Sequence, residues 1–180
     1  PDLVRDRGWE RHISFRWRPE TVKEVMSDLP GMELQESSSQ GRYKISFDVD
    51  PETMPSIEEL RRLLRESRLQ VNIVLSHGAY LDVLPVRASK GMALRYFATR
   101  WGIPLDRCLV AGDSGNDEEM LTGNTLGVVV GNHDPELEKL RGDPWIYFAE
   151  GHYAKAIIEA SKHYDFFGEI KHPAVEAAYD

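Results

Sequence analysis

Cysteine and positive charge are both scarce in this chain of 180 residues, and each shortage excludes a class of protein. Cys108 is the sole cysteine, which rules out a disulfide framework and a zinc site made of several thiolates. Asp and Glu number 30 against 22 Lys and Arg, and the resulting net charge of −8 argues against a nucleic-acid binder. No apolar run approaches the ~20 residues of a membrane span. We therefore expect a globular protein of the reducing cytoplasm, with neither nucleic acid nor membrane as its partner.

Two further features are missing from the sequence. The six histidines are scattered, without the HxH or HExxH spacing of a histidine metal site. The chain begins at Pro1 rather than at a methionine, so we expect it to be a piece of a longer polypeptide. Its length predicts one domain, or one domain with a small partner.

The first half of the chain shows the pattern of an α+β unit. Alternating or apolar runs predict strands over residues 12–17, 32–38, 42–49, 70–76 and 80–86. Helical spacing of apolar residues, with proline near the start, predicts helices over residues 19–31 and 55–68. The resulting order, β-α-β-β-α-β-β, indicates an open-faced α+β unit.

In the second half, short and almost wholly apolar strands alternate with helices. The strands are predicted over residues 107–113, 125–132 and 145–150, and the helices over residues 90–102, 117–123, 135–142 and 152–166. This alternation is typical of a parallel sheet that is covered on both faces. In such sheets the chemistry takes place just beyond the carboxyl ends of the strands.

The motif GDSGND, residues 112–117, directly follows one of these strands. Asp113 and Asp117 leave the strand within one loop, and Gly112 and Gly115 permit a tight turn. Two carboxylates placed in this way can hold a hard divalent cation, and Mg²⁺ favours carboxylates together with water and substrate phosphate. The alternative is a turn whose acids only cap the following helix.

Lys90 stands at the start of the helix predicted over residues 90–102. A cation is unexpected there, because the helix dipole favours positive charge near the C-terminus. A phosphate facing the lysine would explain its position, whereas a solvated surface lysine is the plainer alternative. We expect Lys90, Asp113 and Asp117 to converge, so that they reach one phosphate and one cation.

The segment LPVRASKGMALRYFATRWGIPLDRCLVAGDSGNDEEML resembles the third and fourth motifs of the haloacid dehalogenase superfamily of phosphatases. Further stretches are similar, in the same order, to its sucrose-phosphate phosphatase family: KISFDVDPE, VLSHGAYLDVLP, GVVVGNHDPELEKLRG and GHYAKAIIEASKHYDFFG. The similarity runs from about Trp9 to Gly168. Within the family, the chain most resembles the phosphatase-like C-terminal region of bacterial sucrose-phosphate synthases.

The resemblance implies an α/β fold of the haloacid dehalogenase type, in which an α+β cap is inserted into a Rossmann-like parallel sheet. Residues 1–86 would form the cap and residues 87–180 the second half of the core, so that the first half of the sheet is incomplete. The implied reaction is Mg²⁺-dependent hydrolysis of a sugar phosphate, and the implied substrate is sucrose-6-phosphate. An upstream segment or a glycosyltransferase domain of the same polypeptide is an implied partner.

The resemblance also implies a role for each residue of the candidate site. Lys90 would neutralise the phosphate and the nucleophile. Asp113 and Asp117 would hold Mg²⁺, while Ser114 and Asn116 would shape their loop.

Part of the family's site lies upstream of the cap. The nucleophile and the general acid/base belong to an Asp-x-Asp motif, and a Ser or Thr hydroxyl belongs to a second motif. Because both motifs would precede this chain, we expect the chain to be inactive by itself. In the cap, the family resemblance implies that Lys44 and His77 contact the sugar.

Two other functions stay open on the sequence. One is a non-catalytic regulatory or docking domain of a sucrose-phosphate synthase, which would retain the fold without the chemistry. The other is a compact phosphatase without a cap, in which Asp48 and Asp50 supply the first motif and Ser76 the second. Pro51 argues against it, and so does the short spacing from Ser76 to Lys90. A crossover between parallel strands needs about a dozen residues beyond the strands themselves. We therefore expect both acids in the cap.

Overall fold

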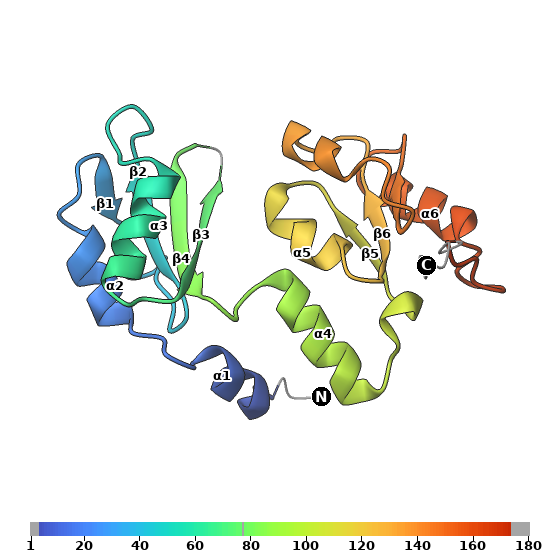
Figure 1. Ribbon diagram of the computed structural model, residues 1–180, viewed down its shortest axis with the longest axis horizontal. Coiled ribbons are helices and arrows are strands. Elements are labelled where there is room, and N and C mark those ends of the chain that lie inside the picture. The colour runs from blue at the N-terminus through green and yellow to red at the C-terminus, as the bar shows by residue number, and fades with distance from the viewer. Residues whose placement is uncertain (1–3, 77, 174–180) are drawn as a thin grey trace, which may run out of the picture. The chain divides into compact units, whose positions relative to one another are not determined.

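The computed structural model describes residues 4–76 and 78–173. The chain folds into two compact units, Pro1–Ser89 and Lys90–Asp180 (Figure 1). Each unit has its own sheet and its own hydrophobic core. Within the described ranges, none of the helices has the length and apolar character needed to cross a membrane.

The first unit is built on an antiparallel sheet with the strand order β1-β2-β4-β3. Its strands are β1 (Met32–Leu34), β2 (Ile45–Val49), β3 (Val71–Ser76) and β4 (Tyr80–Pro85). The helices that share its core are α2 (Pro19–Met26) and α3 (Ile57–Glu66). These elements confirm both predicted helices and the strands predicted after residue 30, although β1 and β2 are shorter than predicted.

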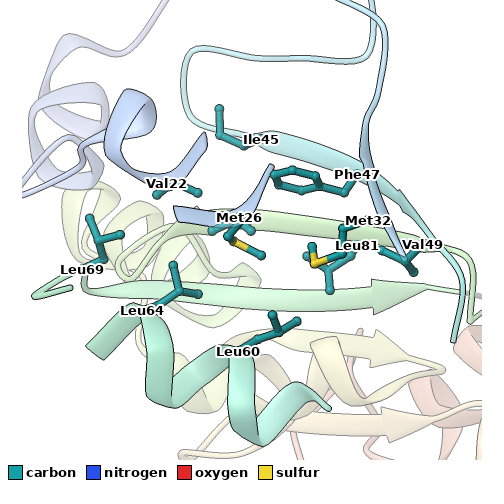
Figure 2. Packing of buried hydrophobic residues seen from close by; sticks show 11 residues of the cluster. Val22, Met26, Met32, Ile45, Phe47, Val49, Leu60, Leu64, Leu69 and Leu81 are labelled. Atoms are coloured by element: carbon teal, nitrogen blue, oxygen red, sulfur yellow. The ribbon is translucent and has the colours of Figure 1, made fainter. Parts of the chain in front are cut away.

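Successive side chains along β2 point alternately into the core and to the opposite face of the sheet. Ile45, Phe47 and Val49 are buried, while Asp48 is exposed. Helix α3 begins with a capping box, in which Ser56 and Glu59 each bind the other's backbone N–H. Figure 2 shows how side chains from α2, α3, the strands and the segment between α3 and β3 meet in this core: Val22, Met26, Met32, Ile45, Phe47, Val49, Leu60, Leu64, Leu69 and Leu81.

The strand predicted over residues 12–17 is wrong, because helix α1 (Arg7–Ile13) extends into this segment. The Asp6 carboxylate caps the helix by accepting hydrogen bonds from the N–H groups of Gly8 and Trp9, at 2.8 and 3.0 Å. Local capping therefore outweighs the apolar alternation that suggested a strand. The observed order of the unit is α-α-β-β-α-β-β.

The second unit contains a parallel sheet, as predicted, and its strand order is β5-β6-β7. Its strands are β5 (Leu109–Gly112), β6 (Leu126–Val129) and β7 (Ile146–Phe148). Its α-helices are α4 (Lys90–Trp101), α5 (Glu118–Leu121) and α6 (Ala154–His163). Its 3-10 helices are η1 (Leu105–Arg107), η2 (Gly115–Asp117) and η3 (Pro135–Leu140). The helix predicted over residues 135–142 is therefore of the tighter 3-10 type.

Both faces of strand β6 are buried, as expected for a parallel sheet with helices on each side. Leu126 and Val128 pack in one cluster with Ala156 and Ala160 of α6. Val129 packs in a second cluster, with side chains of α5 and η3. Burial on both faces thus explains why this strand is almost wholly apolar, as the sequence indicated.

The Glu159 carboxylate links α6 to the end of β7 through hydrogen bonds. It accepts a hydrogen bond of 2.7 Å from the Tyr147 hydroxyl and bonds of 3.0 and 2.8 Å from the N–H groups of Glu150 and Gly151. The hydrogen bond to Glu159, followed by burial, raises the pKa of Tyr147 to about 12. The ring of Tyr147 also stacks on His163, with ring centroids 4.1 Å apart.

Strand β5 lies at an edge of the parallel sheet. Among the residues that the structure describes, β6 is the one strand hydrogen-bonded to it. An edge strand presents backbone N–H and C=O groups with which a further strand can pair. The GDSGND motif lies at this edge, because it begins at Gly112, the last residue of β5.

Leu60→Ala should lower the free energy of unfolding of the first unit by about 2–5 kcal/mol, because Leu60 is fully buried and its loss leaves a cavity. Leu75→Ala is the matched control, since Leu75 is 40% exposed and its truncation should cost less than about 1 kcal/mol. Urea unfolding followed by circular dichroism measures both changes. Equal losses in the two variants would contradict this arrangement of the core.

Candidate active site

The GDSGND motif forms a tight loop between β5 and α5. Gly112 permits the turn, because an added Cβ would lie 2.4 Å from the Cβ of Asp117. Asp117 therefore folds back against the end of β5, where its side chain is only 4% exposed. Asp113, by contrast, is exposed.

Backbone hydrogen bonds hold this loop in place. Oδ2 of Asp117 accepts from the N–H of Asp113 at 3.0 Å and from the N–H of Ser114 at 3.4 Å. The N–H of Asp117 in turn donates to the carbonyl oxygen of Ser114 at 2.9 Å. Asp117 thereby determines the path of the backbone that carries Asp113.

Lys90 reaches the loop from a different element, because it is the first residue of α4. Its Nζ lies 2.5 Å from Oδ1 of Asp117 and 2.7 Å from Oδ1 of Asn116. The lysine side chain is 54% exposed, although its carboxylate partner is almost fully buried. The structure thus brings Lys90, Asn116 and Asp117 together and leaves part of the lysine open to solvent.

Close packing between α4 and α5 brings Lys90 to this position. A Cβ on Gly91 would lie 2.7 Å from the backbone carbonyl of Glu119, so glycine is needed for the approach. Arg95 adds to the contact by donating to the carbonyl oxygens of Glu119 and Thr122, both at 3.0 Å. Sequence analysis missed these residues, although the glycine directly after Lys90 was an available signal.

The oxygen donors of this loop are of the kind that Mg²⁺ prefers. Magnesium is usually bound through one or two carboxylates, while water and substrate phosphate complete its shell. Asp113 is exposed, so its carboxylate is accessible to a cation. The Asp117 carboxylate has roughly four acceptor sites, and its hydrogen bonds to Lys90 and to backbone N–H groups occupy only some of them. In the part of the chain that the structure describes, no three His, Cys, Asp or Glu residues form a cluster that could hold a metal ion. The loop therefore offers part of a coordination shell.

Lys44 belongs to the first unit, directly before β2. Its Nζ lies 3.5 Å from the carboxylate of Asp82 on β4, which also accepts a hydrogen bond of 2.6 Å from the Ser46 hydroxyl. Ser46 and Asp82 are directly paired across the two strands and alternate with core residues, so they lie on the face away from that core. His77, the other predicted sugar contact, lies outside the described residues.

The compact phosphatase, with Asp48 and Asp50 as its first motif, is wrong. Strand β2, which carries Asp48, is antiparallel to both of its neighbours and belongs to the first unit, whereas Asp113 belongs to the second. Asp48 accepts a hydrogen bond of 2.8 Å from the Gln35 side chain, and Asp50 accepts one of 2.9 Å from the Thr53 hydroxyl. Both acids therefore have local structural partners.

A parallel sheet with an acidic loop after one strand, accompanied by a separate α+β unit, is the architecture of the haloacid dehalogenase-like phosphatases. The X-ray structure of the sucrose-phosphatase from Synechocystis, in complex with sucrose and phosphate, matches this chain with a TM-score of 0.81 and 32% identity. The match covers 89% of this chain and 67% of that one. The fold class expected from the sequence is thus confirmed.

The chain belongs to the sucrose-6F-phosphate phosphohydrolase family, which it matches over residues 1–165. Probable sucrose-phosphatase 2 of Arabidopsis thaliana is 33% identical over an alignment of 173 residues, and the match covers 90% of this chain and 41% of that protein. Probable sucrose-phosphate synthase 2 of the same plant is 38% identical over an alignment of 141 residues, and the match covers 69% of this chain and 14% of the synthase. The chain thus spans well under half the length of these relatives.

Gly91→Ala should destabilise the second unit by about 1–3 kcal/mol, because the new Cβ would collide with the backbone of α5. In an unpacked helix the same change would stabilise by about 1 kcal/mol, so the sign of the effect is the test. Gly41→Ala is the control, since an added Cβ there meets no atom closer than 3.5 Å. Chemical denaturation measures both variants. A Gly91→Ala chain as stable as the unaltered one would contradict the close approach of α4 and α5.

Proposed function

We propose that this chain supplies the cap and the second half of the core of a sugar-phosphate phosphatase that hydrolyses sucrose-6-phosphate in the cytoplasm. In this proposal residues 1–86 are the cap and residues 87–180 belong to the core. The observation that supports it most is the contact of Lys90 with Asp117, in the loop that also carries the exposed Asp113. Phosphoryl transfer requires mainly positioning and neutralisation of charge, and these three side chains can supply both.

Each residue of the loop has its own part in the proposed reaction. The Lys90 ammonium binds an oxygen of the substrate phosphate, while Asp117 and Asn116 hold the ammonium in place. Asp113, with Asp117, holds Mg²⁺, which supplies further neutralisation of the phosphate charge when it is bound. Ser114 maintains the turn through its N–H and its carbonyl oxygen.

The nucleophile comes from outside these residues in this proposal. The family resemblance assigns it to an upstream Asp-x-Asp motif, whose first carboxylate attacks phosphorus and whose second carboxyl serves as the general acid/base. We infer that the strand carrying this motif pairs with the edge of β5. That pairing would bring the end of the new strand next to the loop of Asp113, because the carboxyl ends of parallel strands meet at one edge.

The second candidate function is a regulatory domain of a sucrose-phosphate synthase. This function is favoured by the 38% identity with a region that makes up only 14% of the Arabidopsis synthase. A regulatory domain of this kind would have a glycosyltransferase domain as its natural partner. A domain without chemistry has no need of an exposed ammonium held by a buried carboxylate. The arrangement of Lys90, Asp113 and Asp117 therefore favours the phosphatase.

We also propose that the polar face of the first unit's sheet binds the sugar. On this face Lys44 and Asp82 are partly exposed, and the hydroxyl of the buried Ser46 donates to Asp82. Hydroxyl groups of a sugar are both donors and acceptors, so such a group is chemically suited to them. His77 is proposed as a second sugar contact on the family resemblance alone.

The purified chain by itself should release negligible phosphate from sucrose-6-phosphate with Mg²⁺, because the proposed nucleophile is not part of it. Fusion of the upstream core segment of the Synechocystis sucrose-phosphatase to Pro1 should produce Mg²⁺-dependent release. In the fused protein, Asp113→Asn and Lys90→Gln should each lower kcat by at least about 100-fold. A colorimetric phosphate assay measures these rates.

Asp48→Asn is the control variant in the fused protein and should leave its rate largely unchanged. Substantial release by the chain alone that disappears in Asp48→Asn would overturn the proposal. A folded fusion that releases no phosphate would favour the regulatory domain instead.

Lys44→Ala in the fused protein should raise the KM for sucrose-6-phosphate by about tenfold, because a charge-assisted contact to the sugar is lost. The value of kcat should change by less than about twofold, since the contact is equal in the ground and transition states. Lys23→Ala, on helix α2, is the matched control. p-Nitrophenyl phosphate, which lacks the sugar, should show an unchanged KM in both variants, and an unchanged KM for sucrose-6-phosphate in Lys44→Ala would remove Lys44 from the sugar site.

A further inference from the structure

The segment that follows β6 contacts the GDSGND loop at two points that the proposed reaction does not use. The N–H of Asp134 donates to the carbonyl oxygen of Asp113 at 2.7 Å. In the opposite direction, the N–H of Gly115 donates to Oε1 of Glu136 at 2.6 Å. Segments that follow two neighbouring strands are therefore bonded to each other at the loop that carries the candidate site.

Gly115 and Glu136 fit closely against each other. A Cβ on residue 115 would lie 2.6 Å from the carboxyl carbon of Glu136 and equally close to Oε2. The carboxylate therefore occupies the space that a larger residue at this position would fill. Because the carboxylate is the end of a flexible side chain, an added methyl group would displace it without moving the backbone.

The segment that carries Glu136 is itself well anchored. Leu137, the next residue, is fully buried in the core. His133 lies 2.9 Å from Oε1 of Glu138 through Nε2, while its Nδ1 lies 2.7 Å from a backbone carbonyl oxygen. Arg141 donates to both oxygens of Glu138, at 2.7 and 2.9 Å. The hydrogen bond from Arg141, and to a smaller extent the one with His133, lowers the pKa of Glu138 to about 2. A carboxylate on such a segment can hold its partner in a fixed place.

We propose that Glu136 is a positioning residue, which binds the N–H of Gly115 and thereby fixes the backbone that carries Asp113. Asp117 binds the N–H groups of Asp113 and Ser114, and Glu136 binds the next N–H along the chain, so carboxylates from two elements hold the loop. The consequence for metal binding rests on the proposed function, in which Asp113 is a ligand. Residues that orient a metal ligand change metal affinity by about 10- to 100-fold.

Glu136→Ala in the full chain should speed the exchange of the Gly115 amide with D₂O by about tenfold, because a hydrogen bond to a carboxylate is lost. The affinity for Mn²⁺, measured by electron paramagnetic resonance titration, should fall about tenfold. Glu136→Gln keeps an oxygen that can accept the same hydrogen bond and should restore most of both values. Asp134→Asn removes one negative charge but keeps the N–H bonded to Asp113, and should change each value by less than about twofold.

Gly115→Ala tests the same contact without removing Glu136, in case Glu136→Ala disturbs folding. Combined with Glu136→Ala it should add nothing to the loss of Mn²⁺ affinity, because both changes break one hydrogen bond. Unchanged Gly115 exchange in Glu136→Ala would overturn the inference, as would equal losses of Mn²⁺ affinity in Glu136→Ala and Asp134→Asn. An unaltered fused protein that binds no Mn²⁺ would contradict the proposed function, and amide exchange in the chain would then decide the inference by itself.

Discussion

The ion pair between Lys90 and Asp117 is the interaction on which the candidate site depends. It joins the first residue of α4 to the loop after β5, at a carboxylate that is almost fully buried. A buried carboxylate without a partner is costly, so the pair constrains both elements. Gly91 and Gly112 make the approach possible, because a Cβ on the first would meet the backbone of α5 and one on the second would meet Asp117 itself.

This constraint gives the two carboxylates of the GDSGND motif different environments. Asp117 is buried and bonded to an ammonium and to backbone N–H groups, whereas Asp113 is exposed. In the proposed function, Asp117 organises the loop and shares the cation with Asp113, while Lys90 binds the phosphate. The chain would then supply the groups that neutralise charge, and a strand added at the edge of β5 would supply the groups that make and break bonds.

The sequence predicted the features that depend on local signals. Apolar runs located β5 and β6, and helical spacing of apolar residues located α3. The strand predicted over residues 12–17 failed because a local helix cap at Asp6 competes with apolar alternation. The contact of Glu136 with Gly115 could not be predicted, since it joins two loops whose proximity is set by the pairing of β5 with β6. The GDSGND loop was found because its acids and glycines lie within one short motif.

A double-mutant cycle on Lys90 and Asp117 tests the central role of their ion pair most directly. Lys90→Met, Asp117→Asn and the double variant would be compared in the full chain by the free energy of unfolding of the second unit. Because the two side chains share one contact, Asp117→Asn should cost less in the Lys90→Met background than in the unaltered chain, by at least about 0.5 kcal/mol. Effects that add to within about 0.3 kcal/mol would contradict the account, because they would mean that Lys90 and Asp117 act independently.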